Sequence, residues 1–148
     1  NQKQNPLLQI ITQIPKELIL HENTSGVCFV PRWARYPFEI WVVPHRRVSQ
    51  VYELDDEEIK NLSRLLLESS KMLDKVFDEP MPYTLAWQLA PKGYQDTHHL
   101  HWCFQPIKRS KTKLKYLAGV EQITGFYLVD LPPERSARIL RGEEQPDE

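Results

Sequence analysis

The stretch that decides the fold is Thr97-His98-His99-Leu100-His101-Trp102-Cys103-Phe104, in which polar and apolar side chains alternate. Side chains along a strand point to its two faces in turn, so this pattern predicts a β-strand over residues 99–105. The two faces then carry different groups: Leu100, Trp102 and Phe104 toward the core, and His99, His101 and Cys103 on the other side. One apolar and one polar face are typical of an antiparallel sheet, whose polar face is expected to meet solvent.

Further segments are expected to form strands beside this one. Residues 27–30 and 38–43 are rich in β-branched and aromatic side chains, and the prolines between them favour an antiparallel pair. Residues 83–88 predict another strand. Weaker patterns indicate a short helix over residues 7–14 and a last strand over residues 126–129.

Two helices complete the prediction. Residues 56–77 place apolar side chains at helical spacing, and Asp55 followed by Glu58 has the pattern of a capping box. A shorter helix is expected over residues 133–141, with Gly142 just past its end. The order of the elements predicts an α+β fold, in which one long helix packs on a mostly antiparallel sheet and a short helix ends the domain.

The composition suits one domain, because 148 residues can bury a sizeable core without disulfides. We expect this domain over residues 1–142 and a frayed acidic tail over residues 143–148. A net charge of −1 disfavours nucleic-acid binding by bulk charge, and no apolar run is long enough to cross a membrane. Cys28 and Cys103 are expected to be reduced thiols of a cytoplasmic protein.

The polar face of residues 99–105 leaves three interpretations open. In the first, His101 or His99 is a nucleophile or general acid–base, since neutral imidazole attacks phosphorus readily. In the second, His99 and His101 are metal ligands and Cys103 adds a thiolate. In the third, the histidines are a solvated surface cluster without a role.

Other polar residues are candidates for ligand binding. The basic stretch over residues 108–115, which includes Arg109 and Lys115, follows the histidine strand directly and could bind phosphate near it. Gln88 on the preceding strand could bind a phosphate oxygen or orient a histidine. Glu121, on an expected loop between two glycines, could accept hydrogen bonds from sugar hydroxyls. Each of these side chains could equally be an ordinary solvated group.

Taken together, these segments resemble the C-terminal half of galactose-1-phosphate uridylyltransferase, in the histidine-triad (HIT) superfamily. The resemblance is carried in order by residues 29–39, Trp41-Val42-Val43-Pro44-His45, Pro82-Tyr83 with Gln88, His99-Leu100-His101, Arg109-Ser110, Lys115-Tyr116, Gly119-Val120-Glu121, Thr124-Gly125-Phe126-Tyr127 and Pro133-Glu134.

This resemblance implies one HIT-like half-domain that takes part in moving a nucleoside monophosphate between a nucleoside-diphosphate sugar and a hexose 1-phosphate through a nucleotidyl-histidine. The family's nucleophile lies in a His-Pro-His motif that this chain does not contain. By resemblance, His99 and His101 match a structural zinc or iron site whose other ligands lie elsewhere, and Gln88 stands where some members carry a histidine ligand. Lys115, Tyr116 and Glu121 match positions that reach the sugar phosphate, partly across a subunit interface. A homodimer, or pairing with an N-terminal-half domain, is therefore expected.

The same residues also resemble a stand-alone HIT domain, in which the middle histidine of His-x-His-x-His is the nucleophile. His99 and His101 then fill the first two places and Cys103 replaces the third. Under this interpretation, His101 is the nucleophile and Lys115 or Gln88 binds the phosphate. Two alternatives to a transferase follow: a non-catalytic half-domain that binds a nucleotide or sugar phosphate, and a hydrolase or phosphorylase of dinucleoside polyphosphates.

Overall fold

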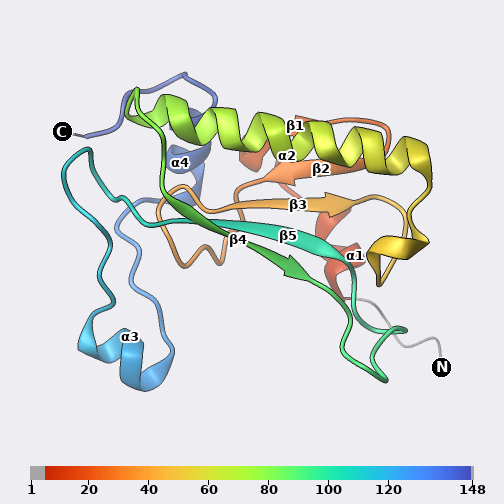
Figure 1. Cartoon of the computed structure of the whole chain (residues 1–148). Helices are drawn as coiled ribbons and strands as arrows, with labels where there is room; N and C mark the ends of the chain where they lie inside the picture. Colours follow the sequence, from red (N-terminus) through yellow and green to blue (C-terminus); the bar gives the residue numbers. More distant parts are fainter. Residues whose placement is uncertain (1–5, 148) are drawn as a thin grey trace.

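Five antiparallel strands form a single sheet in the order β1-β2-β3-β5-β4 in the computed structural model, which describes residues 6–147 (Figure 1). The strands are β1 (Ile19–Glu22), β2 (Gly26–Phe29), β3 (Ile40–Pro44), β4 (Tyr83–Gln88) and β5 (His101–Pro106). The helices are α1 (Pro6–Ile11), α2 (Asp56–Val76), α3 (Gly119–Thr124) and α4 (Pro133–Leu140), with 3-10 turns at Lys16–Leu18 and Val51–Glu53. The expected α+β fold, with a long helix on an antiparallel sheet and a short helix near the end, is confirmed.

Helix α2 covers one face of this sheet (Figure 1). It begins at the predicted capping box: Asp55 accepts a hydrogen bond from the Glu58 amide at 2.8 Å, and the Glu58 carboxylate accepts one from the Asp55 amide at 3.0 Å. The apolar stripe of the helix lies over β2 and β3 and is buried in the same core as the apolar face of β5. That core includes Leu62, Leu65 and Leu73 of α2 with Leu100, Trp102 and Phe104.

Gly26 lies where α2 approaches β2 and β3 most closely. A Cβ at this position would lie 2.7 Å from a Leu62 methyl and 2.7 Å from the Val43 carbonyl oxygen. Because that oxygen belongs to the sheet backbone, it cannot move away without disturbing the ladder. Gly26→Ala is therefore expected to lower the free energy of unfolding by ~1–3 kcal/mol, as overpacking does, in a urea titration. Gly119→Ala is the matched control, since nothing lies within 4 Å of its Cβ position. An equal loss in both variants would contradict the close approach.

Three segments differ from the sequence prediction. The expected strand over residues 126–129 is wrong, because the Leu128 amide donates to the Glu121 carboxylate instead of a neighbouring strand. Glu121, expected on a loop, lies on helix α3. Strand β1 was not predicted, because it is only 4 residues long and a register shift between Ile19 and His21 interrupts its alternation.

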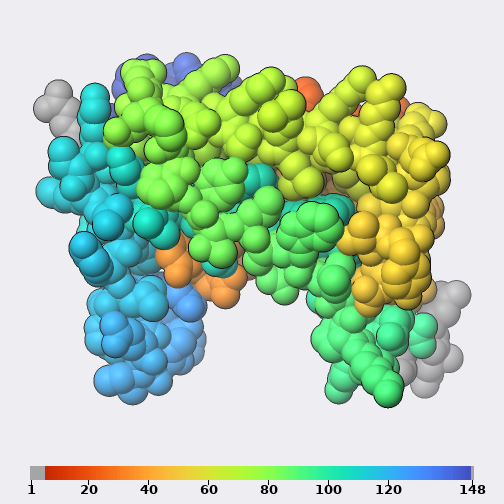
Figure 2. All heavy atoms as spheres, in the orientation of Figure 1, coloured from red at the N-terminus to blue at the C-terminus, as the bar shows by residue number. Residues whose placement is uncertain are grey.

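Residues 107–130, which we call the arm, project from the end of β5 and carry α3 at their tip (Figures 1 and 2). The arm starts with a bridge between Lys108 and Leu114, so it leaves the sheet as a tight return of the chain. Its surface exposes several large apolar side chains: Tyr116, Ile123, Phe126 and Leu128. A feature of this kind marks an interaction surface more often than a solvated loop.

Helix α4 packs beside α2 and is followed by the acidic residues for which the sequence predicts a fraying tail. Gly142 adopts a left-handed conformation (φ 77°) that ends the helix. Beyond it the described acidic residues form ion pairs with the arginines of this segment: Glu144 and Asp147 with Arg135, Glu144 with Arg138, and Glu143 with Arg141. Among residues 6–147, no helix has the length and apolar character that crossing a membrane requires.

Candidate functional site

Two of the three histidines in this stretch are buried: His101 begins β5, and His99 lies two residues before it. His99 Nε2 donates a hydrogen bond to the Pro44 carbonyl at 2.8 Å, since a carbonyl can only accept. The Nδ1 atom of His99 is buried and has no hydrogen-bond partner in the described part of the chain. Burial lowers the pKa of His99. Each feature favours a neutral ring with one free lone pair at Nδ1.

His101 is held in the complementary arrangement. Its Nδ1 donates to the His99 carbonyl at 2.8 Å, which leaves Nε2 as the basic nitrogen. The ring stacks on the indole of Trp41, with centroids 4.6 Å apart and planes inclined by 24°, and lies 5.7 Å from the ring of His98. Burial lowers the pKa of His101 to about 4, so the imidazole is neutral at pH 7.

The expectation of a solvated polar face is therefore wrong. This side of the sheet carries a second apolar layer, in which Val27, Phe29 and Val43 are buried against side chains of α1 and of the segment that follows it. His101 is only 9% exposed and Cys103 only 1%. Burial also raises the pKa of the Cys103 thiol to about 12, so the thiol is protonated at neutral pH.

Two neutral imidazole nitrogens suit zinc or iron, but they are not a complete donor set. Among the described residues, no group of three or more His, Cys, Asp or Glu side chains could hold a metal ion. Gln88 pairs with His101 across β4 and β5, and its backbone carbonyl accepts a hydrogen bond from His98 Nε2 at 3.1 Å. The structure therefore brings Gln88 beside the histidines, as expected, without adding a further strong ligand.

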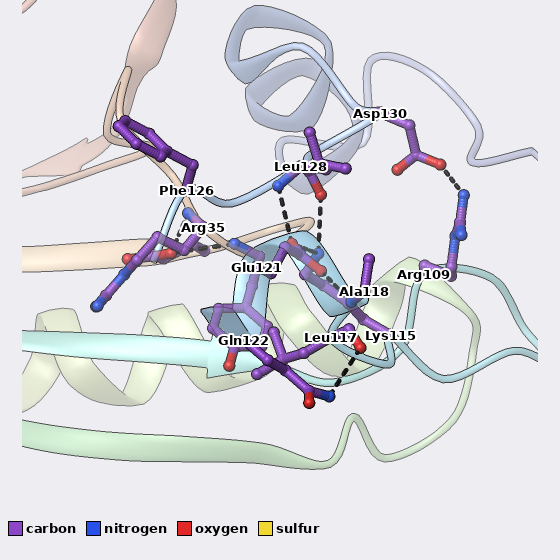
Figure 3. A network of polar contacts seen from close by, with 12 residues as sticks. Arg35, Arg109, Lys115, Leu117, Ala118, Glu121, Gln122, Phe126, Leu128 and Asp130 are labelled. Atoms are coloured by element: carbon purple, nitrogen blue, oxygen red, sulfur yellow. Dashed lines mark hydrogen bonds and ion pairs between the residues drawn. The ribbon is translucent and has the colours of Figure 1, made fainter. Parts of the chain in front are cut away.

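A second group of polar side chains lies on the arm and centres on Glu121 (Figure 3). The Glu121 carboxylate receives the Lys115 ammonium at 2.9 Å, the Leu128 amide at 2.8 Å and the Ala118 amide at 2.6 Å. Lys115 Nζ also donates to the Leu128 carbonyl at 2.8 Å. These donors, led by Lys115, lower the pKa of Glu121 to about 2. The arm is thus closed on itself by one nearly buried ion pair.

This ion pair lines a pocket of about 320 Å³. All four arm residues that the sequence singles out for substrate binding line it: Arg109, Lys115, Tyr116 and Glu121. Arg109 forms an ion pair with Asp130 on the returning segment of the arm (Figure 3), and Tyr116 is 80% exposed. The pocket therefore offers two cations, the two carboxylates of Glu121 and Asp130 that pair with them, and one phenol. Such a set can bind a phosphate and hydroxyl groups.

A family model described as galactose-1-phosphate uridyl transferase, C-terminal domain, matches residues 9–147. The chain belongs to this family. Galactose-1-phosphate uridylyltransferases from Thermotoga maritima and Haemophilus influenzae are 33% and 35% identical to it, over 94% and 85% of the chain. The chain spans less than half of these relatives, 45% and 37% of their lengths.

Solved structures agree with the family. A uridylyltransferase structure superposes with a TM-score of 0.84 at 29% identity, covering 93% of this chain and 44% of that one. An ADP-glucose phosphorylase from Arabidopsis thaliana with bound ADP-glucose gives 0.76 at 25% identity, covering 93% and 43%. A zinc-bound histidine triad protein from Mycobacterium smegmatis, at 14% identity and a TM-score of 0.66 over 97% and 94% of the two chains, shares the fold.

In this uridylyltransferase-family domain the two groups of candidate residues lie at opposite ends of β5 (Figure 1). His101 begins the strand and the arm leaves after Pro106, about 17 Å further at ~3.4 Å per residue. The expectation that the basic stretch lies near the histidines is therefore wrong, although Arg109, Lys115, Tyr116 and Glu121 do come together. Two aromatic rings lie beside these groups: Trp41 stacks on His101, and the Tyr36 ring lies 5.9 Å from Lys115 Nζ.

The Glu121 pairing predicts a specific pH dependence for this uridylyltransferase-family domain. The carboxyl pKa is about 2 in the folded chain and 4.5 ordinarily, so the unfolded chain binds more protons between these values. The stabilisation from Glu121 is therefore complete above about pH 4.5 and is lost as the pH falls toward 2. We expect the Tm difference between the native chain and Glu121→Gln to shrink over this range in a melting series. Glu17→Gln, at an exposed glutamate, is the control, and a Tm difference independent of pH would contradict the prediction.

Proposed function

We propose that this domain takes part in moving a nucleoside monophosphate between a nucleoside-diphosphate sugar and a hexose 1-phosphate. The observation that carries the proposal is the arm pocket, where Arg109, Lys115, Tyr116 and Glu121 meet in a chain of the uridylyltransferase family. Lys115 and Arg109 supply charge for the phosphate, and Glu121 and Tyr116 supply acceptors for sugar hydroxyls. The solved relative with bound ADP-glucose supports a nucleotide sugar as the substrate class.

His101 is the proposed nucleophile if this chain carries out the transfer by itself. Its neutral Nε2 attacks the phosphorus of the nucleotide, the bond from phosphorus to the sugar-phosphate oxygen breaks, and hexose 1-phosphate leaves with the electron pair. The Nδ1–H bond to the His99 carbonyl stabilises the positive charge that forms on the ring. A second hexose 1-phosphate then attacks the same phosphorus and displaces His101. Gln88, beside His101, is the proposed partner of a phosphate oxygen.

The second proposed role for the histidines is a metal half-site. The partnerless Nδ1 atom of buried His99 favours it, because a buried lone pair without a partner suits a metal ion. His99 Nδ1 and His101 Nε2 would then hold zinc or iron together with donors from outside the described residues. A metal bound there would stabilise the fold, and the domain would serve as the supporting half of the enzyme.

We further propose that the arm completes a site on another chain, in a homodimer or with an N-terminal-half domain. The position of the arm supports this, because it leaves the end of β5 opposite to His101 of the same chain. The exposed apolar side chains of the arm suit such an interface. Light scattering should give a dimer; a monomer that binds no nucleotide sugar would refute the proposal. A cytoplasmic location is proposed as well, from the two unpaired cysteines.

The test is the intact mass of the chain after incubation with UDP-glucose, with ADP-glucose in parallel. An added nucleoside monophosphate that is absent in His101→Asn would establish His101 as the nucleophile. No adduct, together with zinc or iron that is lost in His101→Ala, would establish the metal half-site. If the chain forms no adduct and also binds no sugar nucleotide, the proposed function is overturned. Turnover of dinucleoside polyphosphates would replace it with the hydrolase alternative.

A further inference from the structure

Glu39, the residue immediately before β3, carries a fully buried carboxylate and is 0% exposed. Among the described residues its partners are three N–H groups and not a cation. Oε1 accepts from Trp41 Nε1 at 2.8 Å, and Oε2 accepts from the amides of Arg35 and Tyr36 at 2.7 and 3.2 Å. A buried carboxylate is costly unless it is hydrogen-bonded, so this arrangement constrains each group that donates to it.

One oxygen leads to the histidines. The Trp41 indole, which donates to Oε1, stacks on the His101 ring with centroids 4.6 Å apart. The Trp33 ring meets Trp41 edge-on, with centroids 5.3 Å apart. The hydrogen bond to Glu39 defines the direction of the indole N–H and therefore the plane against which His101 rests.

The other oxygen leads to the arm. The two amides that donate to Oε2 belong to the turn before β3, and both side chains of that turn reach the arm. The Arg35 guanidinium lies 5.5 Å from the centre of the Tyr127 ring, and the Tyr36 ring lies 6.2 Å from Tyr127. Lys115 Nζ lies 5.9 Å from the Tyr36 ring. Figure 3 shows Arg35 on the side of the arm that carries Phe126.

The backbone next to Glu39 supports a constrained turn. Phe38 has a φ of 61°, a conformation that bulky side chains rarely adopt, and its ring is buried against Phe77. A strained residue of this kind persists only where the surroundings hold it. The Glu39 carboxylate, with its three donors, is the group that closes this turn.

We infer that Glu39 is a positioning residue for both groups of candidate residues: Oε1 sets the plane of Trp41 against His101, and Oε2 sets the turn that holds the arm. The inference rests on the proposed function only in treating the histidines and the arm pocket as functional groups. The coupling itself is a property of the unliganded chain and is tested without substrate.

The experiment is a mutant cycle on the unliganded chain with two NMR readouts. The first is the shift of the His101 ring protons, which the stacked indole sets, and the second is the exchange rate of the Leu128 amide, which reports closure of the arm. Glu39→Gln should move the His101 shifts and speed Leu128 exchange about tenfold, the effect of losing about one charge-assisted hydrogen bond. In a Trp41→Phe background, Glu39→Gln should move the His101 shifts no further and still speed Leu128 exchange.

Two further variants keep the test decisive if Glu39→Gln does not fold. Trp41→Phe should change the His101 shifts and leave Leu128 exchange unchanged, and Tyr36→Leu should do the reverse. Glu22→Gln, at an exposed glutamate of β1, is the control for the substitution itself. The inference is overturned if Glu39→Gln leaves either readout unchanged, or if either single-branch variant alters both readouts. Since no substrate enters, a failed mass assay for the proposed function leaves this result standing.

Discussion

Replacing Lys115 with methionine is expected to weaken binding of glucose 1-phosphate about a hundredfold. Lys115 links two segments of the arm. Its Nζ donates to the Glu121 carboxylate at 2.9 Å and to the Leu128 carbonyl at 2.8 Å. The variant loses the charge proposed to face the phosphate and leaves Glu121 nearly buried beside an apolar side chain. Calorimetric titration of the native chain and the variant measures the change.

Lys113→Met is the matched control for this prediction, because Lys113 lies two positions away on the arm and is exposed. It carries the same charge loss without touching the pocket, so its binding constant should stay close to that of the native chain. Glu121→Gln in the Lys115→Met background should cost little more, since the pair acts as a unit. Equal weakening by both lysine variants would show that binding follows net charge and not the pocket.

Replacing Phe104 with alanine is expected to lower the free energy of unfolding by ~3–5 kcal/mol. Phe104 is 1% exposed, pairs with Ile40 and Leu85 across the sheet, and meets the ring of Tyr83 edge-on at 5.1 Å. Its loss leaves a cavity in the buried core that Phe104 shares with side chains of α2. A domain of this size has only ~5–15 kcal/mol of net stability, so the change is a large fraction of the total.

Phe126→Ala is the control for the core prediction, since Phe126 is 77% exposed on the arm. Its loss should change the unfolding free energy by no more than ~0.5 kcal/mol, as at other surface positions. Urea titration of the native chain, Phe104→Ala and Phe126→Ala measures the three free energies of unfolding. Comparable losses in the two variants would mean that residues of the arm contribute to the cooperative core, contrary to the fold described above.

Local chemistry was enough to predict most of the fold. The capping box of Asp55 and Glu58 and the apolar spacing of α2 each act over a few residues, and both are found where the pattern predicts them. The alternation of residues 99–105 predicts the buried apolar face, although β5 itself begins at His101 and not at His99. Strand β4 coincides with the predicted residues 83–88 for the same reason. The prediction failed at β1, which is short and interrupted by a register shift, and at residues 126–129, where the Leu128 amide bonds a side-chain carboxylate and not a strand.

The chemical identity of the candidate site was readable from residue types, but its environment was not. The sequence alone pointed to seven candidate residues: His99, His101, Gln88, Arg109, Lys115, Tyr116 and Glu121. Which of them meet depends on where β5 ends and how the arm turns, and this separates the histidines from the arm pocket.

Residue types and short-range spacing therefore settled the helix ends, the core face of β5 and the kind of chemistry this protein can offer, because those properties depend on contacts within a few residues. Burial of His101 under Trp41, its lowered pKa, and the Glu39 links to both groups arise only when the turn before β3, the first helix and β5 pack together. Burial and electrostatics sum over groups that are far apart in the chain, so only the folded arrangement defines them.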